Sequence, residues 1–266
     1  MTSPEAVFLG LLQGATEFLP VSSSGHLLLA EHFLGLAGGG LAFDVMLHLG
    51  TLAAVLLYFR REWWHMAEAL VPGRGATGDR RLLALLVLAT IPGGVFGYLL
   101  DDLAATTLRS PWVVAATLAG VGALFLAAEG VARRDRTLAA LDWRDAAVIG
   151  LAQALAIVPG VSRSGITMTA ALFLGFRRAE AARFSFLLSA PIIAGAGLHE
   201  GHKLLNGTAG PGPEVLWGTL AAFVAGYAVI SWLLAYLARH TFHPFAYYRI
   251  VLAGVVAALL LWGSAA

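Results

Sequence analysis

Long apolar runs separated by short polar stretches dominate the chain. Six of these runs approach the length of about 20 residues that a helix needs to cross a membrane. They cover residues 43–59, 82–100, 112–128, 183–198, 215–237 and 248–262. The pattern predicts an all-α polytopic membrane protein that forms a single integral membrane domain over residues 1–266.

Another apolar segment, at the start of the chain, is interrupted by a polar stretch. Residues 4–18 and 25–35 flank Pro20 and the serines Ser22, Ser23 and Ser24. Each arm is shorter than a span, and the proline with the Ser-Gly run ends a helix. We therefore expect a re-entrant helix-break-helix element that enters and leaves by one face. A single kinked span and a full hairpin are the alternatives.

The same helix-break-helix pattern recurs 140 residues later in the sequence. Between residues 10–35 and 150–175, eleven of 26 positions are identical. Composition bias alone would give about four or five identities, so the match indicates an internal repeat. We expect repeat one over about 1–129 and repeat two over about 140–266, each with one re-entrant element and three spans.

The charge distribution tests this arrangement. Two re-entrant elements and six spans place fourteen arginines on one side, and only Arg109 and Lys203 on the other. The positive-inside rule makes the arginine-rich side cytoplasmic, which puts both termini on the periplasmic side. The two repeats then have inverted topology. If both elements were full hairpins, the excess of arginine on one side would be the same. If each were a single kinked span, that excess would largely disappear. The fourteen are Arg60, Arg61, Arg74, Arg80, Arg81, Arg133, Arg134, Arg136, Arg144, Arg177, Arg178, Arg183, Arg239 and Arg249.

Composition narrows the class of protein further. The chain is 59% hydrophobic and 12% charged, with a mean hydropathy of +0.78, whereas soluble domains carry about a quarter charged residues. The net charge of +1 gives no electrostatic reason to expect nucleic acid. Cysteine is absent, which excludes disulfides, thiolate nucleophiles and Cys-based zinc sites.

In inverted repeats with broken helices, the polar breaks of the two re-entrant elements meet near the bilayer midplane. The serine run at 22–24 begins the second arm of one element, and Ser162, Arg163 and Ser164 begin that of the other. Helix N-termini together with a guanidinium group suit phosphate. Simple N-capping explains any one serine, but the repeated triplet favours an anion site.

Glu17 lies on the first arm, and Gln13, four residues earlier, shares its helix face. A divalent ion, Mg or Ca, held by Glu17, Gln13 and phosphate oxygens would offset the repulsion between carboxylate and phosphate. Glu17 as a general base and Glu17 as a partner of Arg163 are the competing interpretations. His26, one turn after Ser23, can reach that hydroxyl or a phosphate oxygen; plain packing is the alternative.

Two motifs carry a resemblance. Gln13-x-x-x-Glu17 followed by Phe-Leu-Pro-Val-Ser-Ser-Ser-Gly-His, and Pro-Gly-Val-Ser-Arg-Ser-Gly-Ile-Thr at 159–167, resemble the signatures of the undecaprenyl-diphosphate phosphatase family, also called bacitracin-resistance proteins. The similarity covers essentially the whole chain. It implies hydrolysis of a C55 polyprenyl diphosphate in the bacterial inner membrane, for cell-wall synthesis and bacitracin resistance. It also implies a divalent metal and a site open to the periplasm.

The family's functional positions fall here on Gln13, Glu17, Ser23, His26, Ser162, Arg163 and Thr167. Position 13 is Glu or Gln across the family, and Gln here removes a second carboxylate. We expect Ser23 to attack phosphorus with Glu17 or His26 assisting, attack by His26 or a water being the alternatives. The full expected set is catalytic Ser23, Glu17, His26 and Arg163; substrate-binding Ser22, Ser24, Ser162, Ser164, Thr167 and Gln13; and metal-binding Glu17 and Gln13.

The expected partners are a polyprenyl diphosphate lipid and the membrane, and the sequence leaves a homodimer open. Asp44 and His48, one turn apart at the start of a span, are candidates for the border of the cavity, and the resemblance leaves a supporting role open for them. The rival function is a transporter or flippase for lipid or small anions, because inverted repeats suit alternating access. A non-catalytic anion- or bacitracin-binding protein is the third hypothesis.

Overall fold

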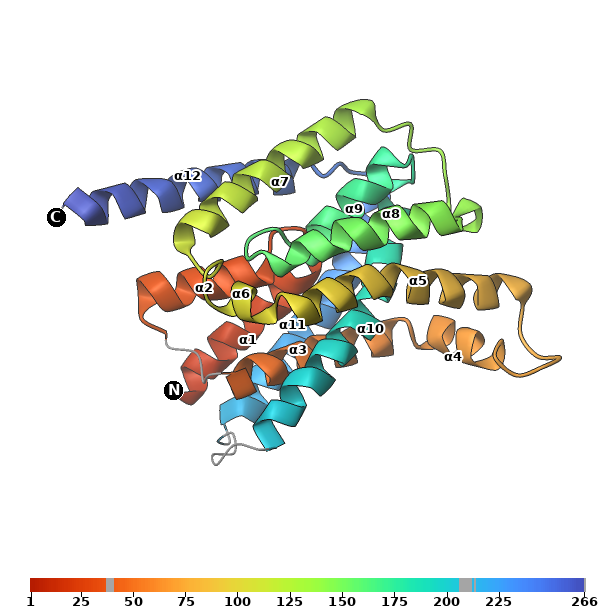
Figure 1. The fold of residues 1–266 in the computed structure, drawn as a ribbon, viewed down its shortest axis with the longest axis horizontal. Coiled ribbons are helices and arrows are strands. Elements are labelled where there is room, and N and C mark those ends of the chain that lie inside the picture. Colours follow the sequence, from red (N-terminus) through yellow and green to blue (C-terminus); the bar gives the residue numbers. More distant parts are fainter. Residues whose placement is uncertain (37–40, 206–211, 213, 266) are drawn as a thin grey trace.

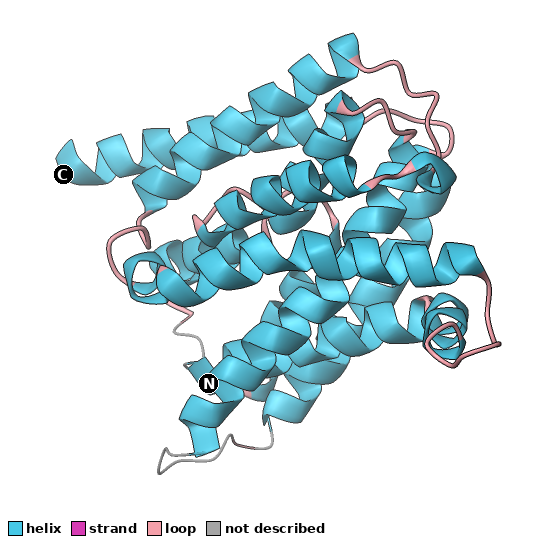
Figure 2. Cartoon of the chain, turned by 45° about the vertical axis from the view of Figure 1, so that its right-hand side comes forward, coloured by secondary structure: helices cyan, strands magenta, loops and turns pink. Residues whose placement is uncertain are grey.

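Helices make up nearly all of the structure, a computed structural model that describes residues 1–36, 41–205, 212 and 214–265. Apart from an isolated bridge between Arg136 and Phe176, these residues contain no β-structure (Figure 2). The all-α prediction is confirmed. The helices are α1 (Ser3–Phe18), α2 (Ser23–Leu34), α3 (Leu41–Tyr58), α4 (Arg60–Glu68), α5 (Thr77–Leu99), α6 (Asp101–Ala105), α7 (Pro111–Val131), η1 (Leu138–Ala140), α8 (Trp143–Ala154), η2 (Leu155–Ile157), α9 (Arg163–Phe173), α10 (Arg178–Leu205), α11 (Glu214–Leu237) and α12 (His243–Ala265).

Five of these helices are long and apolar enough to cross a membrane: α5, α7, α10, α11 and α12. The first predicted run, 43–59, falls on α3, which continues into α4 after a bend of 72°. Counted as one bent unit, this pair is the sixth candidate. The protein is therefore a multi-pass helical membrane protein with five or six candidate spans, and each predicted run lies on its own helix.

The two predicted broken elements are the pairs α1–α2 and α8–α9. In Figure 1 the outer ends of α1 and α2 lie at the end of the molecule that carries both termini, whereas those of α8 and α9 lie at the opposite end. Thr2 forms a capping box that starts α1, and the chain leaves that helix shortly before Pro20. Asp142 caps α8 in the same way, and the hydrogen bond from the Asp145 N–H lowers the pKa of the Asp142 carboxyl.

Small residues let the first arm of each broken element pack closely on a spanning helix. A Cβ on Gly10 of α1 would lie 2.1 Å from the Gly218 carbonyl oxygen of α11. The equivalent Gly150 of α8 packs on α5, where a Cβ would lie 2.6 Å from the Ala89 carbonyl oxygen. Only glycine permits these approaches, which are typical of helix pairs in membranes.

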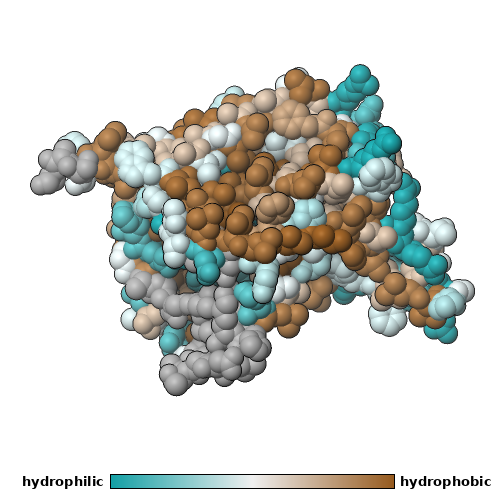
Figure 3. All heavy atoms as spheres, in the orientation of Figure 1, coloured by the Kyte–Doolittle hydropathy of each residue, from teal (hydrophilic) through white to brown (hydrophobic). Residues whose placement is uncertain are grey.

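The surface divides into an apolar band and a hydrophilic end. Figure 3 shows apolar side chains over the middle of one face and hydrophilic atoms at the end where α5 begins. Near that end Glu129 accepts hydrogen bonds from Arg178 at 2.7 and 2.6 Å and from Arg134 at 2.9 Å. These contacts join α7 to α10 at the predicted arginine-rich side.

Candidate active site

The break between α1 and α2 has an unusual backbone. Ser22 has φ 80°, a value that residues other than glycine rarely adopt. Its Oγ accepts the N–H of Gly25 at 3.2 Å and therefore caps α2. Ser24 Oγ lies 3.3 Å from Ser22 Oγ. The turn leaves the first N–H groups of α2, which have no intrahelical carbonyl partner, directed at the break.

The break between η2 and α9 repeats this geometry. Ser162 has φ 72°, and its Oγ accepts the N–H of Gly165 at 3.0 Å. Ser164 Oγ lies 3.2 Å from Ser162 Oγ and donates to the Leu19 carbonyl oxygen of the first break at 3.1 Å. The two breaks are therefore in direct contact, and the N-termini of α2 and α9 both begin at this junction.

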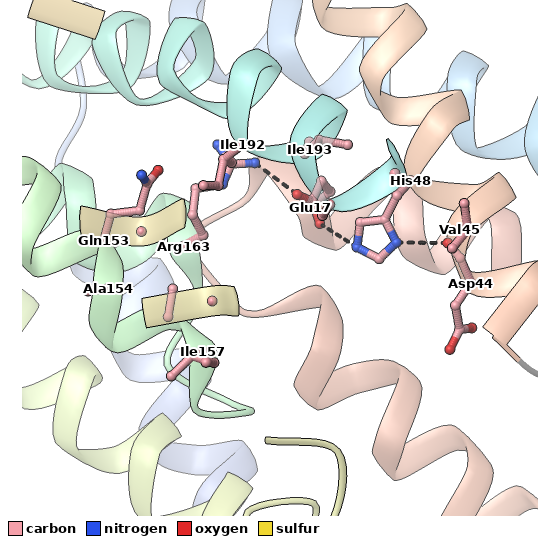
Figure 4. A pocket seen from close by; sticks show the side chains of 15 residues that line it. Glu17, Asp44, Val45, His48, Gln153, Ala154, Ile157, Arg163, Ile192 and Ile193 are labelled. Carbon is pink, nitrogen blue, oxygen red and sulfur yellow. Dashed lines mark hydrogen bonds and ion pairs between the residues drawn. The ribbon is translucent and has the colours of Figure 1, made fainter. Parts of the chain in front are cut away.

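Glu17 is the centre of the site, since four side chains surround its carboxylate. Ser23 Oγ donates to Glu17 Oε2 at 2.6 Å, and Gln13 Nε2 donates to the same oxygen at 3.1 Å. Arg163 Nη2 donates to Oε1 at 2.8 Å, and His48 Nε2 lies 3.9 Å from Oε2. Figure 4 shows Glu17 between Arg163 and His48. A hydroxyl that donates to a buried carboxylate can serve as a nucleophile beside its base.

The charges of this centre are largely buried. The Glu17 side chain is 7% exposed and that of Arg163 is 12% exposed. Arg163 also donates from Nη1 to the Ser185 carbonyl oxygen at 3.0 Å, so α10 fixes the guanidinium plane. His48 Nδ1 lies 2.8 Å from the Asp44 carbonyl oxygen. Because a carbonyl only accepts, Nδ1 carries the proton and Nε2 faces Glu17.

Two cavities open at this centre. The smaller, of about 140 Å³, is lined by Glu17, Ser22, Ser23, Ser24, His48, Ala156, Ser162 and Arg163. The larger, of about 370 Å³, shares Glu17, His48, Ala156 and Arg163 with it and extends between α5 and α10. The site therefore combines hydroxyls, a carboxylate, a guanidinium and two helix N-termini around one space, which suits a phosphate group.

Most of the residues expected at the site are assembled there. Ser23 and Arg163 meet at Glu17, and the serines at 22, 24 and 162 line the smaller cavity. Ser164 and Thr167 are buried and bonded to protein groups, Thr167 Oγ1 lying 2.7 Å from the Ser185 hydroxyl. Neither lines the cavities described, so their contact with substrate stays a prediction.

His26 lies apart from this cluster. Its Nδ1 lies 2.7 Å from the Ser22 carbonyl oxygen, and its Nε2 lies 2.6 Å from the Tyr248 hydroxyl of α12. The carbonyl requires a proton on Nδ1, so in the neutral ring Nε2 accepts from Tyr248. No described hydrogen bond joins His26 to Ser23, and the alternative contact of His26 with a phosphate oxygen stays a prediction. Of the two expected proton acceptors, only Glu17 contacts Ser23.

Arg249, one of the fourteen arginines predicted on the cytoplasmic side, is a further residue of this region. It is fully buried. It donates to the carbonyl oxygens of Pro20 at 3.1 Å, Gly160 at 2.8 Å and Val161 at 3.1 Å. None of the described ion pairs includes it. Arg249 therefore holds both breaks by their carbonyls, and the thirteen other arginines carry the charge bias. The sequence does carry a signal for this role: an arginine inside an apolar run costs free energy in a membrane, so such an arginine is expected to face polar partners within the protein.

The polar groups around Glu17 include few of the ligands that a divalent ion needs. Among the described residues no group of three His, Asp or Glu side chains could hold one. Nothing described bonds to Gln13 Oε1, which is buried beside Glu17. One carboxylate and one amide oxygen, with ligands added by phosphate and water, match the way in which Mg²⁺ is usually bound. The residues thus fit an ion that arrives with a phosphorylated substrate.

Comparison with known proteins places the chain in a family. Residues 6–255 match the model of the family described as "Bacitracin resistance protein BacA". An undecaprenyl-diphosphatase of Rubrobacter xylanophilus is 52% identical, over 97% of this chain and 98% of its own length. Undecaprenyl-diphosphatases of Gemmatimonas aurantiaca and Desulforudis audaxviator are 49% and 46% identical, covering 98% and 97% of each chain. The protein belongs to the BacA bacitracin resistance protein family.

Proposed function

We propose that this protein hydrolyses undecaprenyl diphosphate to undecaprenyl phosphate and inorganic phosphate. The product is the lipid carrier of cell-wall synthesis in its reusable form, which connects the reaction to bacitracin resistance. Family membership supports the substrate. The observation that carries the chemistry is the Ser23 hydroxyl donating to Glu17 at 2.6 Å beside Arg163.

In the proposed mechanism Ser23 Oγ attacks the terminal phosphorus while Glu17 Oε2 takes its proton. The bond from that phosphorus to the bridging oxygen breaks, and undecaprenyl phosphate leaves. Arg163 and the N–H groups of α2 and α9 stabilise the phosphoryl oxygens during this transfer. Water then hydrolyses the serine phosphate, which releases inorganic phosphate and restores the hydroxyl. His26 Nδ1 donates to the Ser22 carbonyl, and a direct part of His26 in the reaction stays a prediction.

We further propose that Glu17 and Gln13 hold a magnesium or calcium ion together with the substrate. Glu17 is the only carboxylate that lines the smaller cavity. A diphosphate brings more negative charge than Arg163 alone can offset. A divalent ion would supply that charge compensation when bound.

The fold we propose consists of two inverted-topology repeats, with six spans and two re-entrant elements. Three observations support it: the two breaks share one backbone geometry, α1 packs on α11 as α8 packs on α5, and the two pairs turn back toward opposite ends (Figure 1). In the inner membrane the arginine-rich end would be cytoplasmic, so both termini and the cavity between α5 and α10 would face the periplasm.

Phosphate release by the purified protein in detergent, with undecaprenyl diphosphate and no ion gradient, tests the function. Turnover under these conditions is expected, whereas a transporter or flippase would bind the lipid without releasing phosphate.

Every group that the mechanism uses lies in one chain. The homodimer therefore stays a prediction, which a mass measurement of the detergent complex tests.

A further inference from the structure

The larger cavity is lined by both polar and apolar residues. Its polar groups are Glu17, His48, Arg163, Asp44 and Gln153, and Figure 4 shows Gln153 and Asp44 on either side of the Glu17–Arg163 pair. Most of the remaining lining is small or aliphatic and comes from α5 and α10. These residues, the apolar body of the cavity, are Gly93, Gly97, Ile192, Ile193, Ala196 and Gly197. One space thus combines polar groups with an apolar body, as an amphiphilic ligand requires.

The cavity has room for a side chain at Gly97. A Cβ added to Gly97 would meet nothing within 4 Å, so this position of α5 borders open space. A proline stands inside each wall helix, Pro92 in α5 and Pro191 in α10, a few residues before these small residues. A proline inside a helix removes one of its backbone hydrogen bonds. Both walls therefore combine a proline with small residues.

The apolar body is continuous with the phosphate site. The two cavities share Glu17, His48 and Arg163, and the larger one has about 370 Å³ against about 140 Å³ for the smaller. A soluble anion would need only the smaller space. We propose that the isoprene units next to the diphosphate lie between α5 and α10 along Gly97 and Ala196. This inference rests on the proposed function and adds the path of the lipid tail.

Filling the cavity tests this path. In Gly97→Leu the new side chain extends into the cavity, whereas in the matched control Gly94→Leu it does not. Gly94 is an exposed residue of the same helix where a Cβ also meets nothing within 4 Å, and it does not line the cavity. We expect Gly97→Leu to raise the KM for farnesyl diphosphate and undecaprenyl diphosphate by about tenfold, with kcat within about twofold. Gly94→Leu keeps both constants.

A second pair covers the opposite wall and guards against misfolding of the first variant. Ala196→Leu is expected to raise KM in the same way, and Gly195→Leu, its neighbour outside the cavity lining, is not. Unchanged KM values in both Gly97→Leu and Ala196→Leu would overturn the tail path, and so would a loss confined to kcat. Wild-type protein that releases no phosphate from either lipid would instead overturn the proposed function.

Discussion

The break before α2 and the break before α9 place a serine in the same rare backbone conformation. Ser22 has φ 80° and ψ 99°, and Ser162 has φ 72° and ψ 112°. In each break the serine hydroxyl caps the following helix through a glycine N–H, at 3.2 and 3.0 Å. Such backbone is strained, and it persists where the surrounding structure holds it. The repeated sequence has therefore produced a repeated frame.

The side chains at equivalent positions of the two breaks differ. The residue after the capping serine is Ser23 in one break and Arg163 in the other. The arm before the break carries Glu17 in the first element and Ile157 at the equivalent place in the second. In the proposed mechanism one half supplies the nucleophile and base, and the other supplies the cation. Neither break is a site alone, which explains why they must be in contact.

Loss of the nucleophile is the strongest way to test this division. Ser23→Ala should lower kcat by a factor on the order of 10³ or more, because no other hydroxyl donates to Glu17 in the described structure. Phosphate release from undecaprenyl diphosphate measures it. Ser189→Ala is the matched control, since that serine is also buried, donates to the Phe186 carbonyl within α10 and does not line either cavity. Phosphate trapped on His26, or an active Ser23→Ala enzyme, would contradict the assignment.

Removal of the proposed metal should have a comparable but somewhat smaller effect. Excess chelator is expected to lower phosphate release by at least about a hundredfold, because the charge of the diphosphate is then met by Arg163 alone. Added magnesium or calcium should restore the rate. Full activity in excess chelator would leave Glu17 with the role of a base only.

The sequence predicts this centre well because its signals are local. The arms, the breaks and the serines follow from residue type and spacing, and the offset of 140 residues relates one break to the other. Glu17, Ser23 and Arg163 stand in motifs whose chemistry is apparent without a fold. Their meeting required only that the two breaks touch, which the predicted repeat supplied.

The contacts of Arg249 and His26 could not be predicted in the same way. Arg249 bonds to the Pro20 carbonyl across 229 positions of sequence. A backbone carbonyl has no residue type, so no pattern points to it as a partner. His26 meets Tyr248 across 222 positions, a pairing that depends on how α12 packs near the first break. Both contacts involve the last helix, whose packing against the breaks the predicted repeat alone does not determine.

The cation of the second break can be tested without removing its charge. Arg163→Lys should lower kcat by about a hundredfold, because one ammonium cannot replace planar donors that reach Glu17 and the Ser185 carbonyl together. Arg109→Lys, on an exposed ion pair with Glu31, is the control and should be neutral. Near-normal turnover in Arg163→Lys would mean that only a positive charge is needed there.

Removal of Arg249, which links the two breaks, should affect both stability and turnover, each to a smaller extent. Arg249→Met would leave carbonyls of both breaks without their donor, a loss of about 1–3 kcal/mol for each such group. We expect a lower Tm and a fall in kcat of about tenfold, since the breaks would shift relative to each other. The exposed Arg239→Met serves as control. A normal kcat with a lowered Tm would restrict Arg249 to stability.

The smallest effect is expected for replacement of His26, because the second break has an isoleucine at the equivalent position. Ile166 stands at the position equivalent to His26, and its N–H bonds to the Ser162 carbonyl at 2.9 Å as the His26 N–H bonds to Ser22 at 3.1 Å. The backbone turn therefore forms without an imidazole. His26→Ile should keep its Tm and lose less than about tenfold in kcat, because Nε2 faces Tyr248 and not Ser23. Tyr248→Phe should have an equally small effect. If His26→Ile were as inactive as Ser23→Ala at an unchanged Tm, the imidazole would itself take part in the reaction, and the chemistry of the first break would have to be reassigned.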